Sequence, residues 1–125
     1  MAPLTPPAPR GRSLIQGYGD GGFRIGGLFH AGSVLVFADA VEAWPVPEPA
    51  GITLDSLAAV TAAGRAVDLL LVGCGRARAV LPESLRQYLR RAGIVAEAMD
   101  TGAACRTFNI LLAEERRVAA ALIAV

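Results

Sequence analysis

The stretch VDLLLVGCGRARAVLPESLRQYLRRAGIVAEAM, residues 67–99, decides the fold. Residues 67–72 are a short and almost continuous apolar run, which is typical of a strand covered on both faces. Pro82 favours the first turn of a helix that ends at Gly93, and residues 94–99 read as a second strand. Two strands joined through a helix predict a right-handed parallel crossover, and therefore an α/β fold.

The segments that follow continue the same alternation. A helix is expected from about Gly102 to Ala113, and the charged turn EERR separates it from residues 118–124. Alanine in this last segment favours a helix, whereas its brevity, its position and the β-branched Val118 and Ile123 favour a strand. We predict a strand.

Glycine and proline divide the first half of the chain into short elements. Residues 1–12 contain four prolines, so we expect a flexible tail there and a single domain over residues 13–125. We expect short strands around the YGDGG turn within 13–27, two strands in 28–38 joined by a turn at 31–33, irregular backbone over 41–51, and a helix between its N-cap Thr53 and Gly64.

Composition excludes several classes of function. The formal net charge is +1, which indicates no electrostatic attraction to nucleic acid or to an anionic membrane. No apolar run is long enough to predict membrane insertion. The beginning of the chain has no apolar signal segment, so we expect a reducing cytoplasm and unpaired cysteines. One histidine and two cysteines give no zinc-ligand spacing, and we expect no metal or cofactor.

Polar residues gather where the two predicted parallel strands end. The carboxyl ends of neighbouring parallel strands meet at one edge of a sheet, so residues 73–75 and 100–102 should lie side by side. Thr101 is the expected N-cap of the next helix, whose amino end, with backbone N–H groups and a guanidinium, suits a small anion. The candidate ligand-binding residues are Gly73, Gly75, Asp100, Thr101, Gly102, Arg106 and Asn109.

A purely structural interpretation of the same residues stays open. Thr101 can act only as a cap, Arg106 can pair with a nearby acid or carbonyl, and Asn109 can bond a loop. Gly73 and Gly75 can serve only to permit a tight turn, because a Gly-x-Gly pattern alone is a weak signal.

Three further side chains have two interpretations each. Cys74 and Cys105 approach the same predicted edge, where they are either a redox pair or two small buried hydrophobic residues, and we favour burial. Trp44 stands beside a proline-rich segment, where it either fills the core or belongs to an exposed interaction patch, and we favour the core.

The combination of YGDGGFRIGG, GSVLV, LLLVGCG and the long run from LPESL through MDTGAACRTFNILLAEERRVAAALI resembles a known family. This small uncharacterised-domain family of bacteria and archaea includes the mitochondrial assembly factor of respiratory complex I, NADH:ubiquinone oxidoreductase. The resemblance covers about residues 13–124. It implies three layers around a mixed central sheet and a final β-strand. The family typically has Gly-Thr-Gly where this chain has Gly73-Cys74-Gly75.

The resemblance also implies a role. It transfers no enzymatic activity, and its eukaryotic members look like assembly chaperones that act through protein contacts. We therefore expect a non-enzymatic interaction module that assists assembly of respiratory complex I, with subunits of that complex as partners and homo-oligomerisation compatible with the sequence. The alternative is a small-molecule or anion-binding protein, or an enzyme, that uses the edge formed by residues 73–75 and 100–109.

Overall fold

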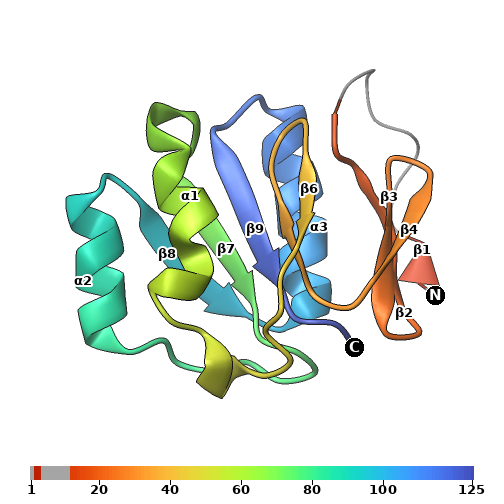
Figure 1. Cartoon of the computed structure of the whole chain (residues 1–125). Helices are drawn as coiled ribbons and strands as arrows, with labels where there is room; N and C mark the ends of the chain where they lie inside the picture. Colours follow the sequence, from red (N-terminus) through yellow and green to blue (C-terminus); the bar gives the residue numbers. More distant parts are fainter. Residues whose placement is uncertain (1, 4–11) are drawn as a thin grey trace.

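A five-stranded mixed β-sheet lies between helices, and a second, smaller antiparallel sheet packs beside it (Figure 1). The structure is a computed structural model that describes residues 2–3 and 12–125. The strands are β1 (Ala2–Pro3), β2 (Ile15–Gly19), β3 (Gly22–Ile25), β4 (Leu28–Ala31), β5 (Val34–Val36), β6 (Val41–Ala43), β7 (Leu69–Gly73), β8 (Val95–Met99) and β9 (Val118–Leu122). The α-helices are α1 (Ala58–Ala62), α2 (Glu83–Arg91) and α3 (Thr101–Ala113).

The predicted crossover over residues 67–99 is confirmed. β7 and β8 are parallel neighbours, with Leu69 opposite Val95, and α2 connects them. β9 is also parallel to β7, whereas β5 is antiparallel to β9, so the sheet is mixed and has the order β6-β5-β9-β7-β8. The prediction of a strand for the last segment is therefore correct as well.

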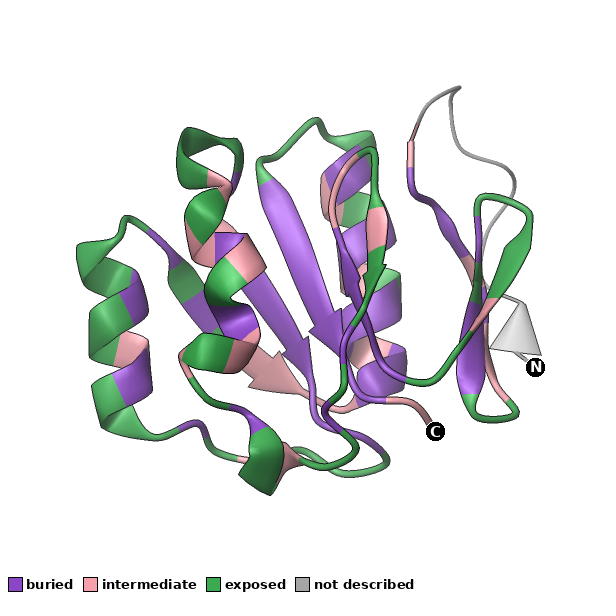
Figure 2. Ribbon diagram, viewed as in Figure 1, coloured by how far each residue is buried: buried purple, intermediate pink, exposed green. Residues whose placement is uncertain are grey.

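Alternating side chains of the large sheet pack into two separate hydrophobic cores, one on each face. On β7, Leu70 and Val72 enter the core under α1 and α2, whereas Leu71 enters the core under α3. The small sheet contributes to the second core, where its Phe23 packs with Phe108 of α3. β7 and β9 are buried almost throughout, as Figure 2 shows, which explains why their sequences lack the polar alternation of half-exposed strands.

Residues 28–38 depart from the prediction of two strands joined by a local turn. β4 pairs with β3 in the small sheet, and β5 pairs with β6 and β9 in the large one, so residues 31–33 connect the two sheets. Burial explains the split: β5 is buried along its whole length, whereas β4 is mostly exposed. The YGDGG segment does form the predicted turn, between β2 and β3.

Two other expectations for the first half need correction. Residues 41–51 are partly regular, because β6 ends before the first proline and can still pair with β5, and a 3-10 turn, η1, covers Pro49–Gly51. Thr53 is not the N-cap, because that position is held by Leu54, although the hydroxyl of Thr53 accepts the N–H of Ser56 in the first turn. The helix beyond it is broken into the 3-10 turn η2 (Asp55–Leu57), α1, and the 3-10 turn η3 (Gly64–Ala66).

Most of the predicted tail, residues 1–12, lies outside the described residues. Of that tail the structure places β1, which pairs antiparallel with β2, and Arg12. In the part of the chain that is described, no helix combines the length and the apolar character needed to cross a membrane.

Candidate functional site

The carboxyl ends of β7 and β8 meet at one edge of the sheet, as the sequence predicts. The N–H of Cys74 donates to the carbonyl of Met99 over 2.8 Å, and the N–H of Thr101 donates to the carbonyl of Gly75, also over 2.8 Å. Residues 73–75 therefore lie directly beside residues 99–101. This edge also receives the amino end of α3.

Thr101 connects three segments at this edge and is fully buried. Its hydroxyl accepts the N–H of Gly75 over 2.9 Å and donates to the carbonyl of Ile123 over 2.7 Å. Gly73 is closely packed, since a Cβ there would lie 3.0 Å from the Cα of Thr101 and 3.0 Å from a methyl carbon of Leu122, so any other residue would require these neighbours to shift. The N–H groups of residues 74 and 75 are thus engaged within the protein.

The helix α3 is capped by Asp100, and the prediction of Thr101 as N-cap is wrong. Asp100 has extended backbone, and its Oδ1 accepts the N–H of Ala103 over 2.9 Å. Thr101 is already the first helical residue. Both residue types suit an N-cap, but the hydroxyl of Thr101 has partners elsewhere in the fold.

Three candidate residues of α3, Gly102, Arg106 and Asn109, do not form one accessible surface. Asn109 is buried, and its amide exchanges two hydrogen bonds with the backbone of Ile15 in β2, at 2.9 and 2.8 Å. Arg106 is exposed, and its Nη1 lies 3.3 Å from the phenol oxygen of Tyr18. Gly102 lies under the same phenol, where a Cβ would come within 2.7 Å of the oxygen.

A small hollow of about 250 Å³ remains at this edge. Gly75, Asp100 and Gly102 of the predicted set line it, together with Tyr18, Arg76 and Val125. Sequence reasoning missed Tyr18 and Arg76, although Arg76 directly follows the Gly-Cys-Gly turn. Arg76 supplies a positive charge to the hollow, and Asp100 supplies a negative one.

The two cysteines are free, buried and packed in different cores. Cys74 lies in the core under α1 and α2, and Cys105 lies in the core under α3. Burial raises the pKa of the Cys74 thiol, and it raises the pKa of the Cys105 thiol to about 12. Both thiols are therefore protonated near neutral pH, which leaves them weak nucleophiles. The interpretation of these cysteines as buried hydrophobic residues fits the structure, and the redox pair does not.

Trp44 belongs to the core, and the alternative of an exposed patch around it is wrong. Its side chain is only 2% exposed, and its indole N–H donates to the carbonyl of Ser56 over 2.8 Å. This hydrogen bond ties the segment after β6 to the turn η2.

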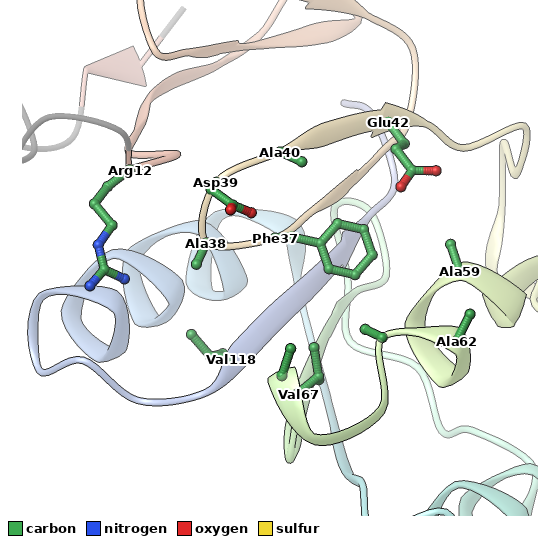
Figure 3. A pocket seen from close by; sticks show the side chains of 12 residues that line it. Arg12, Phe37, Ala38, Asp39, Ala40, Glu42, Ala59, Ala62, Val67 and Val118 are labelled. Carbon is green, nitrogen blue, oxygen red and sulfur yellow. The ribbon is translucent and has the colours of Figure 1, made fainter.

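A larger hollow lies away from this edge, and no sequence pattern indicated it. It is a groove of about 650 Å³ between the β5–β6 hairpin and α1 (Figure 3). The ring of Phe37, which is half-buried, lies between the hairpin and the alanines of α1. The residues that line the groove are Arg12, Phe37, Ala38, Asp39, Ala40, Glu42, Ala59, Ala62, Ala63, Ala66, Val67 and Val118.

Charges occur only at the rim of this groove, which we call the α1 groove. Asp39 and Glu42 are exposed, and neither has an ion-pair partner among the described residues. The guanidinium of Arg12 lies 3.8 Å from the carboxylate of Glu115, on the turn after α3. Residues 2–3 and 12–125 contain no group of three or more His, Cys, Asp or Glu side chains arranged to hold a metal ion.

With this geometry in view, comparison with known proteins places the chain in a family. The model of a protein family of unknown function, DUF498/DUF598, matches residues 15–123. The chain belongs to the DUF498/DUF598 family. The matched range includes every strand from β2 to β9 and all three α-helices.

Members of the DUF498/DUF598 family similar to this chain come from bacteria and animals. An uncharacterised protein of Rhodobacter capsulatus is 44% identical over 123 residues, which cover 98% of this chain and 93% of that protein. NADH dehydrogenase (ubiquinone) 1 alpha subcomplex assembly factor 3 of Xenopus tropicalis is 35% identical over 110 residues. That alignment covers 88% of this chain but 60% of the frog protein, so the chain spans less than two thirds of that relative.

A solved structure shares the same fold. The crystal structure described as an outer membrane protein from Bartonella henselae is 40% identical in sequence and superposes with a TM-score of 0.86. The match covers 92% of this chain and 97% of the Bartonella chain. The α/β fold with a mixed sheet is therefore established for close relatives of this chain.

Proposed function

We propose that this protein assists the assembly of respiratory complex I through contacts with protein partners, without catalysing a reaction. The observation that carries the proposal is the 35% identity to the frog assembly factor over 88% of this chain. Identity of this extent covers both cores rather than one motif. We therefore expect this domain to share a surface for assembly with that relative.

The chemistry of the chain's own residues supports a binding role. The two thiols, which are the strongest nucleophiles in the sequence, are buried and protonated. The α1 groove is largely apolar. The polar side chains of Thr101 and Asn109 form hydrogen bonds with the backbone of the protein itself. These features suit contact with another protein better than turnover of a substrate.

Deletion of the gene tests this proposal. In a strain of the source organism that lacks the gene, we expect native gels to show loss of assembled complex I, and membranes to lose NADH:quinone oxidoreductase activity. Reintroduction of the wild-type gene should restore both. Succinate:quinone oxidoreductase activity is the control, because a general defect of the membrane would lower it too. Normal amounts of assembled complex I in the deletion strain would contradict the proposal.

The hollow at the edge of β7 and β8 supports a second candidate function, binding of a small anion. The supporting observation is the hollow of about 250 Å³ beside the amino end of α3, with Arg76 on its wall. Titration of the labelled protein with inorganic phosphate should shift the amide signals of Gly75, Arg76 and Gly102. Arg76→Gln should abolish the shifts. Shifts that are absent, or that are the same in this variant, would count against the anion site.

A further inference from the structure

We propose that the α1 groove binds an amphipathic helix of a partner protein, with basic residues beside an apolar face. The inference rests on the proposed function for the partner's role in assembly. The chemistry of the groove can be tested separately.

The walls of the groove are apolar, and the side chains on the α1 wall are short. Ala59, Ala62 and Ala63 project from α1 and its C-cap at the i, i+3 and i+4 spacing of one helical face. Ala66, on the 3-10 turn η3 beyond Gly64, adds a fourth short side chain to this wall. The opposite wall carries the half-buried ring of Phe37 (Figure 3). Short alanine side chains permit close approach of another helix, since the distance between packed helices depends on the side chains at the contact.

The position of the groove also favours a helix as its occupant. α1 and α2 lie next to each other on one face of the large sheet (Figure 1). The groove lies between α1 and the β5–β6 hairpin (Figure 3). A helix bound there would extend the helical layer by one member. In three-layer α/β folds, helices cover sheet faces in this manner.

The rim determines the charge of the partner. Asp39 and Glu42 stand at the hairpin side of the groove, exposed and without an ion-pair partner among residues 2–3 and 12–125. The positive charge of Arg12 lies near Glu115. Complementary charges at a rim select partners and speed association, so lysine or arginine beside an apolar helical face fits this groove.

Binding of a synthetic peptide to the full-length chain tests the inference. The probe is a helical peptide of roughly two heptads, with a leucine–alanine face flanked by lysines. The control peptide has the same sequence with glutamate in place of each lysine. We expect the lysine peptide to bind at least about tenfold more tightly than the glutamate peptide. In the labelled protein it should shift the amide signals of Phe37, Asp39 and Ala62.

Matched variants locate the effect. Ala62→Arg places a long cation within the groove and should weaken binding of the lysine peptide by about tenfold or more. Ala58→Arg, on an exposed position of α1 that does not line the groove, should bind it as the wild type does. The double variant Asp39→Asn, Glu42→Gln should lose most of the preference for the lysine peptide. The inference would be overturned if both peptides bound equally, or if the peptide shifted amide signals away from the groove. It would also be overturned if the amide signals of the groove residues changed only with protein concentration, because that would indicate that a second copy of the chain binds there.

The same variants separate this inference from the proposed function. If gene deletion abolishes complex I assembly and Ala62→Arg restores it as well as Ala58→Arg does, the function stands and the groove inference fails. If Ala58→Arg restores assembly and Ala62→Arg does not, although both proteins are folded by circular dichroism, both stand. If deletion leaves assembly normal, the proposed function fails, and the peptide experiment alone decides whether the groove binds a basic helix.

Discussion

The hydroxyl of Thr101 is the most heavily used polar group at the sheet edge. It joins the turn after β7 to the segment after β9, and its residue starts α3. Thr101→Val keeps the shape of the side chain but leaves the N–H of Gly75 and the carbonyl of Ile123 unpaired in a buried place. We expect the free energy of unfolding in urea to fall by about 2–4 kcal/mol.

Thr101→Ser separates the hydroxyl from the methyl group of this side chain. Serine keeps both hydrogen bonds, so this variant should lose only about 1 kcal/mol, from the missing methyl group. Equal losses for the valine and serine variants would show that packing rather than hydrogen bonding makes Thr101 important.

The buried thiol of Cys105 predicts a specific dependence of stability on pH. Burial raises its pKa from an ordinary value of 9.0 to about 12 in the folded protein. Between these values the unfolded chain releases a proton that the folded chain retains, so the stability contribution is complete below pH 9 and is lost as pH rises toward 12. The loss is up to about 1.4 kcal/mol per pH unit.

Urea unfolding of wild type and Cys105→Ala at several pH values from 8 to 11 measures this contribution, with the pH range chosen around the ordinary thiol pKa of 9.0. The variant shifts stability by a packing term that does not depend on pH. The gap between the two proteins should therefore narrow above pH 9. A gap that is constant across the series would show that the thiol does not titrate abnormally.

For single residues, the sequence identified the important positions at the sheet edge but not the role of each side chain. Asp100 and Thr101 are both good N-cap residues, and the pattern alone favoured Thr101. Asp100 is the cap instead, and the Thr101 hydroxyl bonds with Gly75 and Ile123, which are distant from it in sequence. A local pattern carries no information about such partners.

Between elements, Asn109 attaches α3 to the small sheet. Its side chain satisfies both backbone groups of Ile15, next to the point where the register of β2 against β3 shifts. Asn109→Ala would leave both groups buried and unpaired, so we expect a loss of about 2–4 kcal/mol in unfolding free energy. Arg106→Ala, an exposed change on the same helix, should cost no more than about 0.5 kcal/mol. Similar losses for the two variants would contradict this role of Asn109.

The elements were predictable where the hydrophobic period was clear. In residues 67–99, a continuous apolar run, an amphipathic helix and a second strand followed one another, and the parallel pairing followed from their order. In residues 28–38, two short strands were expected, but the pattern could not assign them to different sheets. That assignment depends on β9, which lies far along the chain and provides the partner of β5.

The whole molecule contains a feature that no local pattern predicts. The α1 groove is built from Arg12, the β5–β6 hairpin, α1, the turn η3 with the Val67 that follows it, and the first residue of β9, which are separated by many residues in the chain. Alanines of α1 appear in the sequence as an ordinary helical stripe. Only the fold places Phe37 and the two rim carboxylates opposite them.

The most direct test of the assembly role is to follow the protein during assembly of complex I. Membranes and soluble extract from cells that carry a tagged, functional copy are separated by native electrophoresis, and each fraction is analysed by mass spectrometry. We expect the tagged chain to migrate with complex I subunits in a particle smaller than the mature enzyme and to be absent from the mature enzyme. Migration away from every complex I subunit, in cells that are actively assembling the complex, would contradict the account.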